Sequence, residues 1–260
     1  YSDPRNKPAS CPDTVRGAQR ERTLSQRRRC KNLETIAFGH STHRTRLLRH
    51  VRSQTERSMP TLFLVRHGET DWNRSGQIMG ERPIPLNRNG ETQAHRLAKL
   101  LSRCSLGALY SSPVARALQT AEILAAALHM PVTVERGLTE IGVGQWEGRY
   151  WKDLTEDIVR HNFYAMPQET RPPGGETLHE VQARAVATVE RAGARVGAGP
   201  LLFVSHADVL RAIVAHYLRA DFQTVRQMRF DHASLTALEV NGSAADLLFL
   251  NYTPDLGILG

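Results

Sequence analysis

The sequence has few cysteines and no long apolar run. No stretch of about 18 apolar residues occurs, which is the length that a membrane-spanning helix needs. Its three cysteines, Cys11, Cys30 and Cys104, form no Cys-x-x-Cys pair, and His179-Glu180 has no second histidine four residues on. These absences argue against a disulfide framework and the common zinc motifs, and they favour a reducing, cytoplasmic compartment.

Basic residues are concentrated at the N-terminus. The formal net charge is +8, but residues 1–58 alone hold 14 Lys and Arg against 5 Asp and Glu, and residues 59–260 hold 20 against 21. The first 58 residues show no sustained hydrophobic period, so we expect a disordered basic leader, or upstream sequence absent from the native protein, with Met59 as a natural start. An Arg-rich targeting peptide and a nucleic-acid-binding arm are the alternatives.

From residue 59 onward, short apolar runs alternate with amphipathic segments. The expected strands are 62–65, 106–111, 132–134, 201–204 and a terminal hairpin of 234–240 and 247–250 around Asn241-Gly242. The expected helices are 91–101, a helix to Leu128 capped by Ser112 with Pro113 first, 151–164, 177–196 with a Thr177/Glu180 capping box, and 207–218. This alternation predicts an α/β fold with three α/β/α layers and a mostly parallel central sheet, built as a single domain over 59–260.

Two of the expected strands end in histidine. The strand at 62–65 runs into Arg66-His67-Gly68, and the strand at 201–204 runs into Ser205-His206. Open α/β sheets hold their ligands at the carboxyl ends of their strands, so the two imidazoles can face one crevice. Gly68 lets the backbone turn tightly and approach whatever Arg66 and His67 hold. A single histidine at a strand end is more often structural, but two in matching contexts favour a functional site.

Further charged residues fit an anion site. Arg116 lies in the first turn of an expected helix, where backbone N–H groups and the helix dipole favour an anion. Two guanidinium groups and two imidazoles suit phosphate. Glu140 lies on the glycine-rich loop of residues 137–148, where a carboxylate can serve as general acid or base. The competing Glu147 is interpreted as structural. Thr70 and Asn73 could add neutral hydrogen bonds to phosphate oxygens.

Several ordered segments carry a family resemblance. They are Leu64-Val-Arg-His-Gly-Glu-Thr70 with Trp72-Asn73, Pro85-Leu-Asn-Arg-Asn-Gly-Glu-Thr-Gln-Ala94, Tyr110-Ser-Ser-Pro-Val-Ala-Arg-Ala-Leu-Gln-Thr-Ala121, Leu138-Thr-Glu140, Gly144-Gln-Trp-Glu-Gly148, Gly174-Gly-Glu-Thr177 and Val204-Ser-His206. With them the chain resembles the histidine phosphatase superfamily, the phosphoglycerate mutase-like branch 1. It looks most like small phosphatases of the α-ribazole and broad-specificity types. One departure is Ala207-Asp208, since Gly commonly follows the second histidine.

The resemblance implies a mechanism and its residues. His67 would attack the substrate phosphorus and form a phosphohistidine, while Arg66, Arg116 and His206 would stabilise the phosphoryl oxygens. Glu140 would protonate the leaving alcohol and then activate water. Gly68, Thr70 and Asn73 are expected beside the substrate. No metal or other cofactor is expected, and the expected partner is a small phosphorylated substrate rather than nucleic acid or a membrane, with a homodimer left open.

Phosphatase and mutase chemistry share this intermediate. Mutases that resemble the family carry longer inserts between the acid Glu and the second His, whereas Glu140 and His206 are only 66 residues apart. A phosphomonoesterase is therefore favoured over a cofactor-dependent phosphoglycerate mutase. A catalytically inactive binding module is less favoured, because the nucleophile, both arginines, the acid and the second histidine are all present. Residues 75–85 and 149–173 are expected at the mouth, where Arg149, Tyr150, Arg160, His161 and Arg171 could favour a second anion or be solvated.

Overall fold

The centre of the protein is a six-stranded sheet. The computed structural model describes residues 61–154, 157–196 and 199–254, so the basic segment 1–58 and Met59 lie outside the described residues. The strands are β1 (Leu62–Arg66), β2 (Ala108–Ser111), β3 (Val132–Val134), β4 (Leu201–Ser205), β5 (Leu235–Asn241) and β6 (Ala244–Tyr252). Their order is β3-β2-β4-β1-β5-β6. The first four run parallel and β5 pairs antiparallel with β1 and β6, so the predicted mostly parallel sheet is confirmed.

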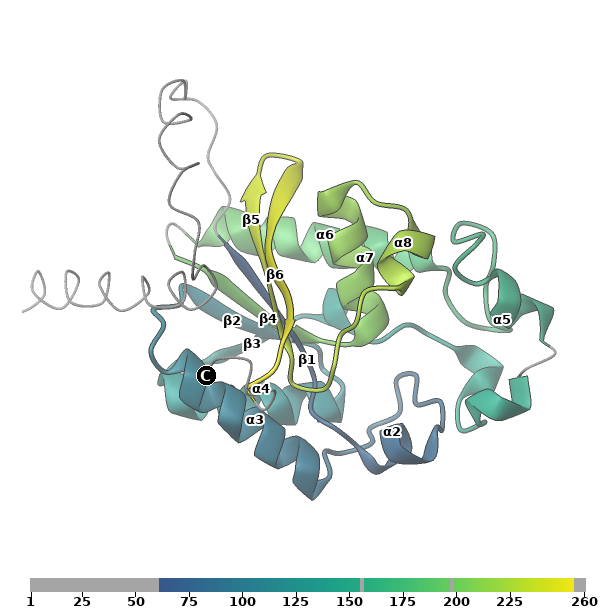
Figure 1. The fold of residues 1–260 in the computed structure, drawn as a ribbon, viewed down its shortest axis with the longest axis horizontal. Helices are drawn as coiled ribbons and strands as arrows, with labels where there is room; N and C mark the ends of the chain where they lie inside the picture. Colours follow the sequence, from purple (N-terminus) through teal and green to yellow (C-terminus); the bar gives the residue numbers. More distant parts are fainter. Residues whose placement is uncertain (1–60, 155–156, 197–198, 255–260) are drawn as a thin grey trace, which may run out of the picture.

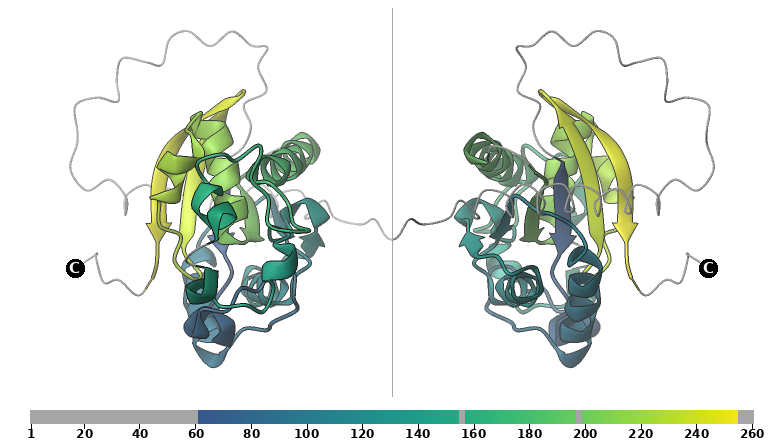
Figure 2. Two further views of the ribbon diagram at one scale, coloured as in Figure 1. Left: turned by 90° about the vertical axis from the view of Figure 1, so that its right-hand side faces the viewer. Right: turned by 90° about the vertical axis from the view of Figure 1, so that its left-hand side faces the viewer.

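Helices cover both faces of the sheet (Figures 1 and 2). The helices α3 (Arg88–Leu101) and α4 (Ala115–Leu128) share one apolar core with Phe63 and Val65. The helices α6 (Leu178–Arg195) and α7 (Ala207–Leu218) share the other with Leu62 and Leu64. Successive side chains of a strand point to opposite faces, so β1 supplies both cores and must be apolar throughout. The three-layer α/β/α prediction is confirmed.

Short elements connect these layers. They are α2 (Asp71–Ser75), η1 (Arg136–Leu138), η2 (Gly144–Trp146), η3 (Trp151–Leu154), α5 (Ile158–Asn162) and α8 (Phe222–Arg226). The predicted capping box of α6 is confirmed, because the Thr177 side chain accepts from the Glu180 N–H and the Glu180 side chain accepts from the Thr177 N–H. Among the described residues, no helix is long and apolar enough to cross a membrane.

The predicted start of α4 is wrong. The helix begins at Ala115, and Val114 occupies the cap position without a side-chain hydrogen bond, so Ser112 is not the N-cap and Pro113 is not the first helical residue. The backbone N–H of Ser112 still donates to Val204 O, which keeps this residue at the end of the sheet. Its hydroxyl accepts from the Val114 N–H and lies against His206 instead of capping the helix.

The predicted helix over 151–164 is also wrong as a single element. Residues 151–154 form η3, and α5 starts anew after Asp157, whose side chain accepts from the N–H groups of Val159 and Arg160. A capping carboxylate at this position starts a second, separate helix. Smaller differences lie at element ends, as α3 begins at Arg88 behind the capping side chain of Asn87, β2 begins at Ala108, and β6 begins at Ala244.

Candidate active site

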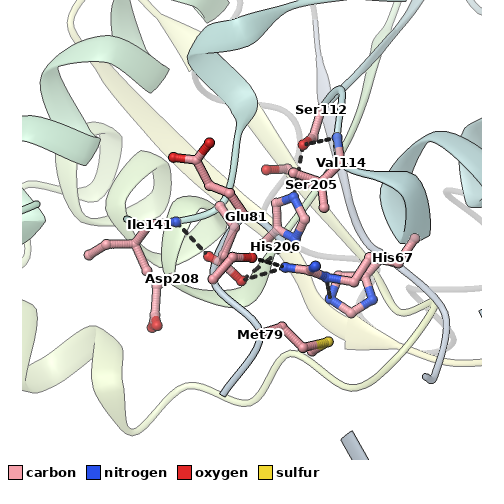
Figure 3. Close-up of polar contacts among 12 residues, drawn as sticks. His67, Met79, Glu81, Ser112, Val114, Ile141, Ser205, His206 and Asp208 are labelled. Carbon is pink, nitrogen blue, oxygen red and sulfur yellow. Dashed lines mark hydrogen bonds and ion pairs between the residues drawn. The ribbon is translucent and has the colours of Figure 1, made fainter. Parts of the chain in front are cut away.

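Two histidines lie side by side at one edge of the sheet. Strands β1 and β4 are parallel neighbours, and Arg66 pairs with Ser205 in register, so His67 and His206 follow at equivalent positions. The backbone N–H of His67 donates to Ser205 O, which joins the two strand ends. Both side chains are buried, and their ring centroids lie 5.2 Å apart (Figure 3). The predicted meeting of the two imidazoles is confirmed.

Hydrogen bonding defines the tautomer of His67. Its Nδ1 lies 2.7 Å from Gly68 O, and a carbonyl oxygen only accepts, so Nδ1 carries the proton. Its Nε2 accepts from Nε of Arg116 at 3.2 Å. Burial lowers the pKa of His67 well below 6.5, and the positive charge of Arg116 lowers it further. His67 is therefore a neutral imidazole whose Nε2 lone pair is the nucleophilic position.

The Arg116 guanidinium is fixed by backbone oxygens. It is fully buried, with Nη2 donating to Gly80 O at 2.9 Å and Nη1 donating to Arg82 O at 3.2 Å. Glu147 holds this turn in place, since its carboxylate accepts from the Glu81 N–H at 3.0 Å and from Nε of Arg82 at 3.3 Å. Glu147 thus acts on the site through the backbone that anchors Arg116, in agreement with its structural interpretation.

Arg66 lies at the end of β1 and, with His67, lines a cavity at this edge of the sheet. Its Nη1 donates to Phe230 O at 2.6 Å, and its Nε is buried without a hydrogen-bond partner among the described residues. Burial lowers the pKa of Arg66 to about 10, so the guanidinium stays charged at neutral pH. A half-buried cation whose buried Nε–H still lacks an acceptor is suited to an anionic oxygen.

Glu140 lies between the second histidine and Arg116. Its Oε1 accepts from the Ile141 N–H at 3.0 Å, and its Oε2 lies 3.6 Å from both Nη2 of Arg116 and Nδ1 of His206. Burial raises the pKa of Glu140 to about 7, and the charge of Arg116 opposes that shift. A carboxyl group that titrates near neutrality can give and take a proton in one catalytic cycle.

The sequence did not identify Ser112 as a partner of His206. The Ser112 hydroxyl and Nε2 of His206 form a hydrogen bond of 2.8 Å. Burial lowers the pKa of His206 well below 6.5, and the charge of Arg116 adds to this. The Ser-Ser-Pro segment before α4 was the available signal, because it ends a strand beside β4.

The neutral residues of the first motif have different positions. Asn73 lines the cavity. Thr70 is the N-cap of α2, and its buried hydroxyl lies 2.9 Å from Asn73 Oδ1. Neither Thr70 nor Gly68 lines the cavity. Gly68 packs against the start of α3, and a Cβ there would lie 2.5 Å from Gly90 O. Thr70 and Gly68 therefore shape the loop that carries His67, and the structure gives them no direct position beside a ligand.

The cavity in front of His67 measures about 220 Å³. Its lining includes Arg66, Glu140 and Asp208 among charged residues, and aromatic residues that the sequence did not identify: Trp72, Trp146, Trp151 and Phe163. The 75–85 loop contributes as expected through residues 76–80. The five expected mouth residues Arg149, Tyr150, Arg160, His161 and Arg171 are not in the lining. In the part of the chain that the structure describes, no three His, Cys, Asp or Glu side chains cluster as metal ligands would.

Comparison with known proteins identifies the family of this chain. The family model for the histidine phosphatase superfamily (branch 1) matches residues 62–253. The chain belongs to this superfamily. The predicted resemblance is confirmed, and the match spans both histidines, both arginines and Glu140.

Similar members of the histidine phosphatase superfamily include enzymes named for two activities. The probable phosphoglycerate mutase GpmB of Salmonella choleraesuis is 32% identical over 188 residues, covering 71% of this chain and 87% of that protein. A mycobacterial glucosyl-3-phosphoglycerate phosphatase structure matches with a TM-score of 0.70 at 26% identity, covering 75% of this chain and 100% of that one. The α-ribazole phosphatase of Shigella flexneri matches with a TM-score of 0.66 at 29% identity, covering 74% and 96%. Enzymatic function is thus supported, with phosphatases and mutases both among the relatives.

Proposed function

We propose that the protein is a metal-independent phosphomonoesterase that acts on a small phosphorylated metabolite through a phosphohistidine. The observation that carries this proposal is the state of His67. Its Nδ1–H donates to Gly68 O at 2.7 Å, so Nε2 carries the lone pair, which accepts from Nε of Arg116 at 3.2 Å and must leave that hydrogen bond to attack phosphorus. A neutral imidazole fixed next to a guanidinium is arranged to attack a phosphoryl group and to stabilise its charge.

The first half of the reaction forms the phosphoenzyme. Nε2 of His67 forms a bond to phosphorus while the bond from phosphorus to the leaving alcohol oxygen breaks. Glu140, whose pKa is about 7, gives its proton to that oxygen, so the alcohol departs neutral. Arg66 and Asn73 line the cavity and can contact the phosphoryl oxygens, whereas Arg116 and His206 are fully buried behind the lining and balance the charge from there, beside Nε2 of His67 and Glu140.

The second half releases phosphate. The Glu140 carboxylate takes a proton from water, and the water oxygen forms a bond to phosphorus as the bond to Nε2 breaks. Inorganic phosphate leaves, His67 returns to its neutral form, and Glu140 is again protonated for the next cycle. The same carboxyl group serves both halves because its pKa lies near neutral pH.

The test is release of inorganic phosphate from p-nitrophenyl phosphate in the presence of EDTA. Wild-type protein should hydrolyse it, and His67→Ala should abolish turnover while its thermal unfolding stays cooperative. Retained turnover in a folded His67→Ala protein contradicts the proposal. Acid-stable phosphate on the protein instead of acid-labile phosphate would contradict the phosphohistidine.

A phosphoglycerate mutase is the second candidate, favoured by the 32% identity to GpmB. Against it stand the two phosphatase structures and the short span of 66 residues from Glu140 to His206. Strong interconversion of 3- and 2-phosphoglycerate with negligible release of phosphate would favour the mutase.

The expected surroundings of the enzyme belong to the same proposal. We propose a cytoplasmic enzyme whose partner is its phosphorylated substrate, and not nucleic acid or a membrane. The support is the near balance of 20 basic and 21 acidic residues over 59–260. Assays in a protein that starts at Met59 test whether the basic N-terminal segment contributes to activity.

A further inference from the structure

The wall of the cavity outside the phosphate end is apolar and largely aromatic. Two chain segments supply it, with Trp72 and Ile78 from one and Trp146, Trp151 and Phe163 from the other. The ring centroid of Trp146 lies 6.3 Å from that of Trp151 and 6.3 Å from that of Phe163, so the three rings form one cluster. Aromatic side chains contribute most of their binding energy by covering apolar or aromatic surface.

Among the described residues that line the cavity, one carries a positive charge and two carry carboxyl groups. Arg66 is its one basic side chain, and it lies next to His67, whereas Glu140 and Asp208 both contribute carboxyl groups. Asp208 is already engaged by Arg211, with 2.9 Å between Nη1 and Oδ1, and by the hydroxyl of Tyr164. The lining therefore offers no second cation to a carboxylate or a second phosphate on the substrate.

Basic residues near the wall are held by other groups. Arg82 pairs with Glu147 at 3.3 Å and lies over the ring of Trp72. Arg160 lies over the ring of Trp151. Neither Arg82 nor Arg160 is in the lining, so a substrate carboxylate placed inside the cavity against this wall would lose water while the lining offers it no second cation, which is costly. The indole N–H of buried Trp146 has no hydrogen-bond partner among the described residues, so a neutral acceptor on the ligand is compatible with this wall.

We propose that this cavity selects a phosphomonoester whose leaving group is uncharged and apolar, with an aromatic ring favoured. The inference rests on the proposed function for its reaction, but it concerns binding and can be measured apart from turnover. It separates this chain from enzymes whose substrate carries a carboxylate beside its phosphate, phosphoglycerate among them. Trp151 is the specificity-determining residue to test, because it lines the cavity and is 43% exposed, so its replacement need not disturb the core.

Binding is measured by calorimetry with two non-hydrolysable ligands, 2-phenylethylphosphonate and 3-phosphonopropanoate. The wild-type protein should bind the phenyl ligand tighter by about tenfold to a hundredfold, the gain expected for covering one aromatic ring. Trp151→Ala should remove most of this preference. Ile158→Ala is the matched control, since Ile158 is 68% exposed, lies in the same segment and is not in the cavity lining; it should change neither affinity.

Equal or tighter binding of the carboxylate ligand by wild-type protein overturns the inference, as does binding of neither ligand. This comparison requires no variant to fold. Turnover of 2-phenylethyl phosphate and 3-phosphoglycerate, both esters of alcohols, is measured in parallel. Tight phenyl binding without release of phosphate from either ester would contradict the proposed function while supporting the inference. Turnover that favours 3-phosphoglycerate would support the proposed function and contradict the inference.

Discussion

Arg116 donates a hydrogen bond from Nε to Nε2 of His67 over 3.2 Å, and both side chains are buried. A cation so close to an imidazole disfavours a second positive charge, which is one reason that the pKa of His67 is lowered. The same contact directs the guanidinium at the nitrogen where the phosphoryl group would be attached. One residue thus keeps the nucleophile neutral and supplies charge to the group being transferred.

Replacement of the Arg116 guanidinium by an ammonium tests its role in stabilising the transferred phosphoryl group. Arg116→Lys is expected to lower kcat/KM for p-nitrophenyl phosphate by about 10²- to 10³-fold, as loss of one fixed donor does at other charge-stabilising sites. Lysine also cannot satisfy both Gly80 O and Arg82 O with a planar fork. Arg88→Lys, an exposed arginine at the start of α3, is the control and should retain wild-type rates. Equal rates for both variants would contradict this assignment.

The role of Glu140 predicts a dependence on the leaving group. In Glu140→Gln, hydrolysis of an alkyl phosphate should fall by about 10²- to 10⁴-fold, because an alkoxide needs its proton. Phosphorylation by p-nitrophenyl phosphate should fall far less, since p-nitrophenolate leaves unprotonated. Stopped-flow mixing should then show a burst of p-nitrophenolate followed by slow turnover, as water lacks its base. A uniform loss for both esters, without a burst, would argue against the acid–base role.

The pH profile gives a second view of the same carboxyl group. The folded pKa of Glu140 is about 7 and its protonated form is the one that donates, so kcat/KM for an alkyl phosphate should fall as pH rises through about 7. The pKa of His67 is lowered well below 6.5, so protonation of the nucleophile should limit the rate only in more acidic solution. The limb near pH 7 should disappear in Glu140→Gln, whereas a limb from the substrate phosphate would persist.

Buried neutral histidines should make the fold sensitive to acid. Burial lowers the pKa of His232 from 6.5 to about 3, and the pKa values of His67 and His206 are lowered in the same direction. The unfolded chain therefore binds more protons, so stability is full above pH 6.5 and decreases as pH falls toward 3. Glu140 has the opposite effect on stability. Its pKa is raised in the folded state, so its contribution to stability increases as pH falls through about 7.

His232→Gln should reduce this loss. Urea unfolding between pH 6.5 and 5 should show a slope of the unfolding free energy with pH that is smaller by about 1 kcal/mol per pH unit in the variant, close to the limit for one titrating group. An identical slope in both proteins would show that His232 titrates normally in the folded state.

The loop that carries His67 depends on two glycines in contact. A Cβ on Gly90 would lie 2.1 Å from Glu69 O, so Gly90→Ala must displace the loop or the start of α3. We expect a loss of about 1–3 kcal/mol in unfolding free energy, together with reduced activity. Gly242→Ala, in the turn between β5 and β6, where φ is 63° but the space is open, should cost only about 1 kcal/mol and leave activity unchanged. Equal stability of Gly90→Ala and wild type would contradict the close contact.

The main catalytic candidates were predictable because each followed from one local rule. Strand ends placed His67 and His206 at one edge of the sheet, and a helix start placed Arg116 beside them. Glycines marked the loop of Glu140. Residues 149–173 were predictable as part of the mouth, and Trp151 and Phe163 from this segment line the cavity. Which of its side chains face the cavity depends on the path of a long connection, broken into η3 and α5, and was not predictable. No local rule marks Trp146 as a lining residue.

Local rules also failed where one side chain had two competing partners. Ser112 before Pro113 has the pattern of a helix cap, but the Ser112 hydroxyl forms its bond with His206, which lies 94 residues away in sequence. Thr70 shows the opposite case, since a side chain expected at the ligand instead caps α2. Long-range contacts of this kind leave no periodic signal in the sequence.

The pairing of Arg66 with Ser205 in adjacent parallel strands has a consequence for how the site can vary. The separation of the two histidine backbones is set by the main-chain hydrogen bonds that join β1 to β4, and hydrogen bonds to Gly68 O and to Ser112 orient the two rings. Substitutions in either core can therefore accumulate without moving the histidines apart. The loops around the site can therefore change in sequence while the spacing of the two histidine backbones stays the same.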